Sequence, residues 1–131
     1  MSNSSGQKKI LLLEECRETR DELEAMLKRD GYKVQAARNE EEAIERAQTS
    51  GPDLILVSLA GTSTRIVNAA RQIRFHSNLS YRIPVVIFSS SITPEGEEWE
   101  IDGNIHITAP DSFTQLRMLL RRVVHEISQK S

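Results

Sequence analysis

The feature that most constrains the fold is the alternation of short, unbroken apolar runs with longer segments that repeat apolar residues at helical spacing. Three such runs, Ile10 to Leu13, Leu54 to Val57 and Val85 to Phe88, fit strands that are buried on both faces. Weaker strands are predicted at residues 33–37 and 105–107. This alternation predicts a parallel sheet with helices on both faces, joined by right-handed crossovers.

Four longer segments have the spacing of amphipathic helices. Apolar residues recur three and four positions apart around Leu23 to Leu27, Ala43 to Ala47, Ile66 to Ile73 and Leu116 to Ile127. The acidic stretch before the fifth strand is different, because it also contains proline and glycine. We predict at most a short helix there, around Glu97 to Ile101.

Length and charge narrow the possible classes of protein. A chain of 131 residues suits one domain, predicted over residues 8–129 after a polar, disordered lead at residues 1–7. The net charge of -2 gives no bias toward nucleic acid, and no apolar run approaches the roughly 20 residues that cross a bilayer. The lead also lacks the apolar core of a signal peptide. We therefore expect a cytoplasmic protein with no nucleic-acid or membrane partner.

Cysteine and histidine are scarce in this chain. The single cysteine, Cys16, excludes an internal disulfide, and the three scattered histidines give no zinc-binding spacing. Because Cys16 follows two acidic residues, we expect its thiolate to be disfavoured and the thiol to be unreactive. No glycine-rich phosphate loop is present, and we expect no cofactor.

Five sequence landmarks cover nearly the whole chain after residue 8; in order they are KKILLLEE, GPDLILVSL, RQIR, IPVVIFSS and HITAP. Their order and spacing resemble the receiver domain of response regulators, the proteins of two-component signal transduction. The resemblance implies a flavodoxin-like α/β fold, with a doubly wound, five-stranded parallel sheet in the order 2-1-3-4-5. It also implies that the residues of a phosphorelay site would meet at the carboxyl ends of the strands.

The resemblance further implies a set of site positions. In receivers, two acidic residues after the first strand and an aspartate ending the third strand hold magnesium, and that aspartate accepts the phosphoryl group. The matching residues in this chain are Glu14, Glu15 and Ser58. A serine hydroxyl is neutral, so it needs a base to act as a nucleophile and cannot replace a carboxylate as a magnesium ligand. Glu14 and Glu15 are thus weak metal candidates, and we expect no tight metal site.

Two further strands complete the comparison with receivers. Ser89 matches the hydroxyl residue that ends the fourth strand, whereas Ala109 stands where receivers have a lysine that neutralises phosphoryl oxygens. His106 occupies the position of the switch aromatic, so Ser89 and His106 are the switch-equivalent residues. We predict a degenerate phosphorylation pocket without catalytic residues; its members are Glu14, Glu15, Ser58, Ser89 and Ala109.

These departures predict a pseudo-receiver, which is not an enzyme and acts in signalling by phosphorylation-independent binding to a protein partner or a second copy of itself. The output surface of receivers corresponds here to about residues 94–127, and we expect no output domain to follow it. Trp99, Arg117 and Arg121 are the candidate contacts on this surface. The apolar stripe of the last helix has six members, so we expect part of it to stay exposed between the two arginines; the six are Leu116, Leu119, Leu120, Val123, Val124 and Ile127.

Two other functions are compatible with the same fold. One is a phosphoacceptor receiver that keeps magnesium at Glu14 and Glu15 and uses another residue as the acceptor. The other is a flavodoxin-like binder of a nucleotide or a cobalamin, held in the crevice at the strand ends. A magnesium-dependent mass gain with acetyl phosphate would identify the first, and the absorption spectrum of the purified protein would identify the second.

Overall fold

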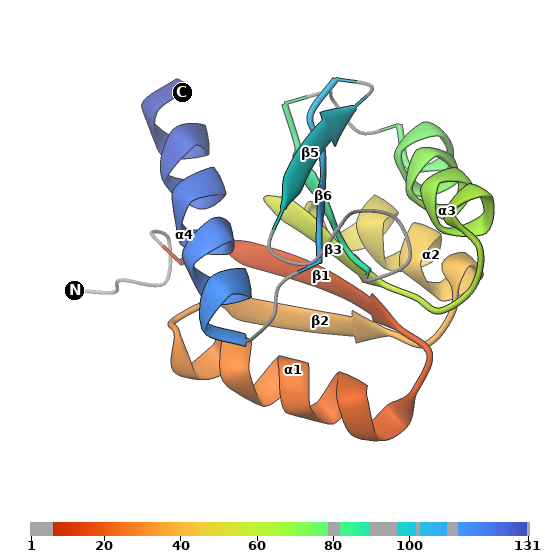
Figure 1. Ribbon diagram of the computed structural model, residues 1–131, viewed down its shortest axis with the longest axis horizontal. Coiled ribbons are helices and arrows are strands. Elements are labelled where there is room, and N and C mark those ends of the chain that lie inside the picture. The colour runs from red at the N-terminus through yellow and green to blue at the C-terminus, as the bar shows by residue number, and fades with distance from the viewer. Residues whose placement is uncertain (1–6, 79–81, 90–96, 102, 110–112, 131) are drawn as a thin grey trace.

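The computed structural model describes residues 7–78, 82–89, 97–101, 103–109 and 113–130, the last four of these by their backbone only. Most of the predicted disordered lead, residues 1–6, lies outside this range. Figure 1 shows the elements in chain order: β1 (Lys9–Glu14), α1 (Arg17–Arg29), β2 (Lys33–Ala37), α2 (Glu40–Ser50), β3 (Leu54–Ser58), α3 (Ser63–His76), β4 (Val85–Phe88), β5 (Glu98–Ile101), β6 (Ile105–Thr108) and α4 (Phe113–Lys130).

The strands form one sheet in the order β2-β1-β3-β4-β6-β5. Five of them are parallel, and β6 takes the place of the fifth strand, so the predicted fold class and the order 2-1-3-4-5 are confirmed. The sheet has one strand more than predicted, because β5 pairs with β6 in the antiparallel direction at the edge.

The short helix predicted around Glu97 to Ile101 is wrong, since this segment is β5. Its sequence Glu-Trp-Glu-Ile alternates acidic and apolar side chains, which is the period of a strand. The alternation lets Ile101 reach the core while Glu98 and Glu100 face the other side. A weak propensity of glutamate for strands is overridden here by pairing with the free edge of β6.

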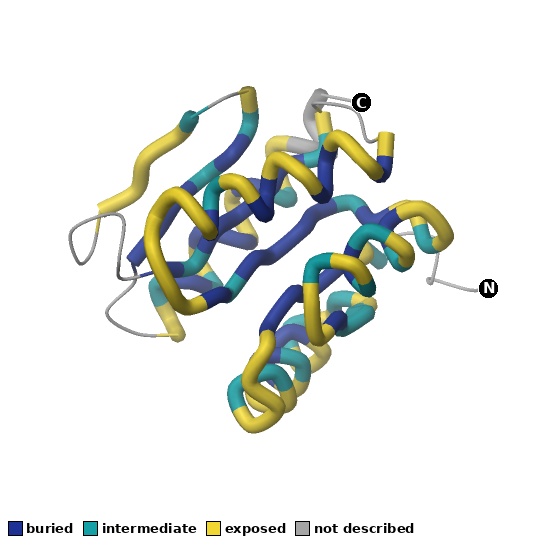
Figure 2. Tube along the Cα trace, turned by 90° about the vertical axis from the view of Figure 1, so that its right-hand side faces the viewer, coloured by how far each residue is buried: buried dark blue, intermediate teal, exposed yellow. Residues whose placement is uncertain are grey.

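The sheet separates two apolar cores, one on each face. In the unbroken apolar strands alternate residues enter opposite cores: Leu11 and Leu13 pack with α2 and α3, while Ile10 and Leu12 pack with α1 and α4. Figure 1 shows these two pairs of helices on opposite sides of the sheet, and Figure 2 shows the buried central strands between them. Helices on both faces were predicted and are confirmed.

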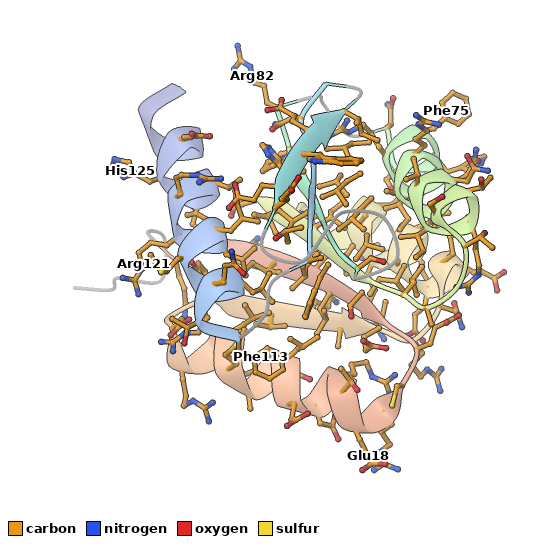
Figure 3. All side chains as sticks on the ribbon, viewed as in Figure 1. Glu18, Phe75, Arg82, Phe113, Arg121 and His125 are labelled. Atoms are coloured by element: carbon orange, nitrogen blue, oxygen red, sulfur yellow. The ribbon has the colours of Figure 1, made fainter. Side chains whose placement is uncertain are left out.

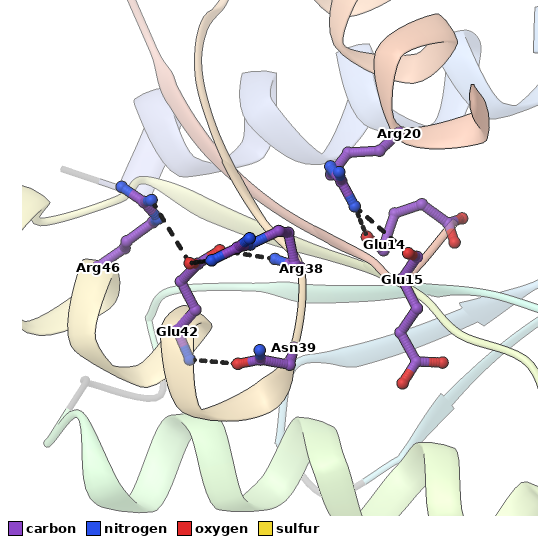
Figure 4. A network of polar contacts seen from close by, with 7 residues as sticks. All are labelled: Glu14, Glu15, Arg20, Arg38, Asn39, Glu42 and Arg46. Carbon is purple, nitrogen blue, oxygen red and sulfur yellow. Dashed lines mark hydrogen bonds and ion pairs between the residues drawn. The ribbon is translucent and has the colours of Figure 1, made fainter. Parts of the chain in front are cut away.

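The two ends of α2 are set by a side-chain cap and by a glycine. Asn39 caps α2, with its Oδ1 accepting from the backbone N of Glu42 at 2.8 Å. The carboxylate of Glu42 in turn accepts from the backbone N of Arg38 at 2.8 Å, as Figure 4 shows. Gly51 ends this helix in the left-handed region, with φ of 61°, where glycine has no steric cost.

Arg74 is a buried cation at the carboxyl-terminal end of α3, with 6% of its surface exposed. Its guanidinium donates to the carbonyl oxygens of Ile83 and Gly103, each at 2.7 Å, and of Asn104 at 3.3 Å. Arg74 therefore ties α3 to the segments that lead into β4 and β6.

The apolar stripe of α4 is more completely buried than predicted. Leu116, Leu119, Leu120 and Val123 are all buried, and Val124 packs partly buried against the same core. Ile127, the sixth member, has no described side chain. The expectation of an exposed outer edge is therefore wrong for the described part of this stripe. None of the helices, over the residues described, is long and apolar enough to cross a membrane.

Candidate functional site at the carboxyl edge of the sheet

The predicted pocket residues gather at one edge of the sheet, where the parallel strands have their carboxyl ends. Glu14 ends β1 and Ser58 ends β3, and the two residues are register partners. Ser89 directly follows β4, and Ala109 directly follows β6. Glu14, Ser89 and Ala109 are buried, Ser58 is half-buried, and Glu15 is exposed. The strand topology thus brings the sequence-predicted positions to one place.

The Glu14 carboxylate is satisfied within the chain. Ser58 Oγ donates a hydrogen bond to Glu14 Oε1 at 2.6 Å, and the backbone N of Cys16 donates to Glu14 Oε2 at 2.9 Å. Both oxygens of this buried side chain therefore have a donor. The serine at position 58 acts here as a hydrogen-bond donor to the acid that ends β1.

The Glu15 carboxylate is neutralised by an arginine. Arg65 Nη2 lies 2.6 Å from Glu15 Oε2, and Arg65 also donates to the backbone carbonyl of Ala60. Arg20 donates to the backbone carbonyls of Glu14 and Glu15, at 2.9 and 3.4 Å, as Figure 4 shows. Two arginines therefore surround the acidic pair.

Sequence analysis did not identify Arg65 as part of this site. The residue lies in the first turn of α3, where Thr62 caps the helix by accepting from the Arg65 backbone N at 3.2 Å. Its contact with Glu15 spans 50 residues of sequence. No local pattern signals such a contact, although the Thr62 cap itself is a recognisable helix start.

The magnesium ion that receivers hold does not fit these residues. A hard divalent cation needs several oxygen ligands, with carboxylates as the main source of negative charge. In this chain Glu14 already accepts two hydrogen bonds, Glu15 is paired with Arg65, and position 58 has no carboxylate. Across the described ranges no group of three or more histidine, cysteine, aspartate or glutamate side chains could hold a metal ion.

The β4 and β6 side of the pocket is apolar or neutral. The backbone N of Ser89 donates to the carbonyl of Thr108 at 2.9 Å, which continues the strand pairing to the end of the sheet. The Thr108 hydroxyl is buried and has no hydrogen-bond partner among the described residues. Ala109 is buried with 2% exposure and adds no charge. Among the described residues at the ends of β4 and β6, Ser89, Thr108 and Ala109 thus provide no cation for a phosphoryl group.

His106 faces away from Ile105 and Ile107, as the strand alternation predicts, because those two residues belong to the core under α2 and α3 and His106 does not. Its Nε2 lies 2.8 Å from Asn104 Oδ1. Burial lowers the pKa of His106, against the opposing effect of Glu100 and Glu126. The imidazole is therefore held by the turn before β6.

The three candidate partner contacts have different surroundings. Trp99 is 46% exposed, and its Nε1 donates to Glu97 at 3.2 Å. Arg121 is exposed and points outward from α4, as Figure 3 shows. Arg117 instead makes a two-pronged contact with Asp30 at the end of α1, with Nε and Nη2 donating at 2.8 and 2.7 Å. These hydrogen bonds lower the pKa of Asp30, so Arg117 is a link between α1 and α4.

Cys16 differs from its predicted state. It is the exposed N-cap residue of α1. Hydrogen bonds from the backbone N and the hydroxyl of Thr19, and then from the backbone N of Glu18, lower the pKa of the thiol, while Glu14 opposes them. The expected disfavoured thiolate is wrong, because the first turn of the helix contributes more than the adjacent acid.

Several solved structures are similar to this chain in the arrangement of their helices and strands. No protein-family model matches the chain. The chemotaxis protein CheY4 of Vibrio cholerae has a TM-score of 0.68 at 18% identity, over 89% of this chain and 98% of that one. The response regulator TrrA of Thermotoga maritima, in complex with magnesium and BeF, has a TM-score of 0.68 at 17% identity, over 89% and 99% of the two chains.

A response-regulator receiver domain protein of Clostridium thermocellum has a TM-score of 0.72 at 12% identity, over 95% of this chain and 99% of that one. These likenesses extend over nearly the whole of each chain. The order of the parallel strands, β2-β1-β3-β4-β6, is that of the flavodoxin-like fold. The chain therefore has the flavodoxin-like fold of response-regulator receiver domains.

Proposed function

We propose that the chain is a pseudo-receiver of two-component signalling, which binds a protein partner independently of phosphorylation and catalyses no reaction. The main support for the proposal is that the carboxylates of Glu14 and Glu15 already have partners within the chain. Ser58 donates to Glu14 at 2.6 Å, and Arg65 pairs with Glu15 at 2.6 Å. The groups that hold magnesium in a receiver are thus engaged with the chain's own side chains.

The chemistry of phosphoryl transfer supports the same proposal. A transfer to Ser58 would need a base to take the hydroxyl proton and positive charge to stabilise the phosphoryl oxygens. Glu14 is close enough to accept the proton, but its negative charge would repel the incoming phosphoryl group at the same distance. Ala109 supplies no compensating charge. Association with a protein partner is then the remaining way for the chain to pass on a signal. The exposed Trp99 and Arg121 are the candidate contacts for this association.

The test is labelling of the purified chain with acetyl phosphate and magnesium, followed by intact mass measurement. We expect no mass gain for the wild-type chain, whereas stoichiometric labelling of any pocket residue would contradict the proposal. Calorimetric titration with magnesium adds a second measurement. The variant Ser58→Asp should gain magnesium affinity, and the double variant Ser58→Asp with Arg65→Ala should gain more, because Glu15 is then released.

A matched control separates the pocket from the general effect of one added negative charge. Thr114→Asp places the same charge at an exposed position in the first turn of α4. This control should leave magnesium affinity unchanged. In Ser58→Asp the extent of phosphoryl labelling should increase less than the magnesium affinity, because phosphoryl transfer also needs a cation at position 109. Equal recovery of labelling and of magnesium affinity would contradict the assigned role of Ala109.

A further inference from the structure

We propose that the outer edge of β5 is a docking site for an extended, basic segment of a protein partner, which adds a strand to the sheet. The inference rests on the proposed binding function and names the class of partner. β5 is the last strand in the order β2-β1-β3-β4-β6-β5, so within the described part of the chain no strand pairs with its outer side.

The hydrogen bonds of the neighbouring strands show which backbone groups of β5 point outward. The backbone N atoms of Val85 and Ser89 donate to the carbonyls of Asn104 and Thr108, so the even-numbered residues of β6 direct their backbone groups toward β4. The odd-numbered residues of β6 therefore face β5. Their register partners in β5 are Trp99 and Ile101.

It follows that Glu98 and Glu100 direct their backbone N–H and C=O groups away from the sheet. These two residues and Trp99 between them are exposed, and in Figure 2 the strand is the exposed outermost one of the sheet. A row of unpaired donors and acceptors of this kind is a template for another extended chain. The four-residue length of β5 limits the added strand to a short segment.

The charges around this edge favour a basic partner. Glu97, Glu98 and Glu100 are exposed carboxylates, and Glu126 of α4 lies near enough to act on the same histidine as Glu100. Arg122 of α4 pairs with Glu98 at 2.5 Å and offsets one of these charges. An excess of negative charge remains on the side of Glu100. Lysine or arginine at alternate positions of an added strand would lie opposite these glutamates.

The same residues disfavour a second copy of the chain as the occupant. In an antiparallel pair of β5 strands, every register that keeps Trp99 and Ile101 on one face places glutamate opposite glutamate. Like charges directly opposite each other destabilise a strand pair. Trp99 lies on the other face of β5, where its exposed ring can cover apolar side chains of the partner.

The experiment uses the position of Trp99, which is the only tryptophan of the chain and therefore reports directly on β5. A synthetic peptide that alternates lysine and valine is titrated into the full chain while tryptophan emission is followed. We expect a saturable change that weakens with added salt. A peptide that alternates glutamate and valine should produce none, and equal binding of both peptides would overturn the proposal.

Two variants separate backbone pairing from charge. Glu100→Pro removes an outward N–H while leaving the pairing of β5 with β6, and it should abolish binding. Glu100→Lys should weaken binding about fivefold, the effect of turning one cross-strand attraction into repulsion. The matched control Glu22→Lys makes the same change of charge on the exposed face of α1 and should bind as the wild-type chain does.

The remaining outcomes are also decisive. Undiminished binding to Glu100→Pro would exclude strand addition. Should that variant fail to fold, a peptide methylated on alternate backbone nitrogens must lose binding to the wild-type chain. A wild-type dimer in sedimentation that Glu100→Lys dissociates would identify a second copy as the occupant and overturn the proposal. Failure of peptide binding leaves the absence of phosphorylation untouched, and labelling by acetyl phosphate would contradict only the proposed function.

Discussion

The strands β1 and β3, in the middle of the sheet, differ from β5, at its edge, in what determines their structure. β1 and β3 are buried on both faces, and their unbroken apolar sequences place them in the middle of the sheet. β5 is exposed and acidic, and its structure depends on the strand beside it. The two interior strands are thus specified by their own composition, whereas β5 is specified by the partner available at the edge of β6.

The two regions also differ in how their charges are compensated. At the ends of β1 and β3, Glu14 and Glu15 each have a donor within the chain. At β5 only Glu98 among the exposed glutamates of the strand has an arginine partner in the described structure. Compensated acids stabilise the domain, while uncompensated acids at an open edge remain able to interact with a partner.

The largest expected difference between these regions is in how much a buried side chain of each contributes to the free energy of unfolding. Leu56→Ala in β3 should lower the free energy of unfolding by about 3 kcal/mol, because a fully buried side chain leaves a cavity. Ile101→Ala in β5 should lower it by less than about 1 kcal/mol, since this side chain is half-buried at the edge. Urea denaturation of both variants measures the difference. Equal losses would show that β5 belongs to the core as fully as β3.

A smaller effect is expected at the link between α1 and α4. Arg117→Ala should lower the melting temperature more than Arg121→Ala, its exposed neighbour on the same helix, because only Arg117 makes hydrogen bonds to Asp30. The pKa of Asp30 is lowered in the folded chain, so the pair stabilises the fold above the ordinary aspartate pKa, about 3.9. This contribution is lost as the pH falls through the lower pKa of the folded state.

Thermal unfolding of the wild-type chain and Arg117→Ala over a range of pH checks that sign. The difference in melting temperature should be constant near neutral pH and should shrink in acid. A difference that grows as the pH falls would contradict the assigned pair.

The smallest effect concerns one thiol and leaves the fold unchanged. Cys16 should react with iodoacetamide at a pH below that required by an ordinary cysteine, because hydrogen bonds from Thr19 and Glu18 favour the thiolate. Thr19→Val removes the hydroxyl contribution and should shift the pH dependence of the rate upward. Thr64→Val, an exposed change in the first turn of α3, is the matched control. An unshifted profile in Thr19→Val would contradict this explanation.

The fold could be predicted from the sequence because β1, β3 and β4 are buried on both faces, and such strands are unbroken apolar runs. It also placed Glu14, Ser58 and Ser89 at one edge, because parallel strands bring their carboxyl ends together. It missed the strand at Glu98–Ile101, where a period of two is carried by only four residues. Short segments of this kind are decided by tertiary pairing.

The long-range pairings of side chains, within the site and between helices, could not be predicted from the sequence. Arg65 meets Glu15 across 50 residues, and Arg117 meets Asp30 across 87. Such contacts depend on how two elements pack, and no spacing along the chain encodes them. Arg117, predicted as a partner contact, also links α1 to α4 through Asp30, which the sequence did not indicate.

Arg74 bears on how the domain folds. Its acceptors are carbonyls 9, 29 and 30 residues further along the chain, so a buried guanidinium depends on two segments closing around it. Opening of the turn before β6 would remove two of these acceptors, the carbonyls of Gly103 and Asn104, from a buried guanidinium, and this cost couples the turn to α3. Native-state hydrogen exchange should therefore show β6 opening in the same cooperative unit as α3, even though β5 beside it has an open edge.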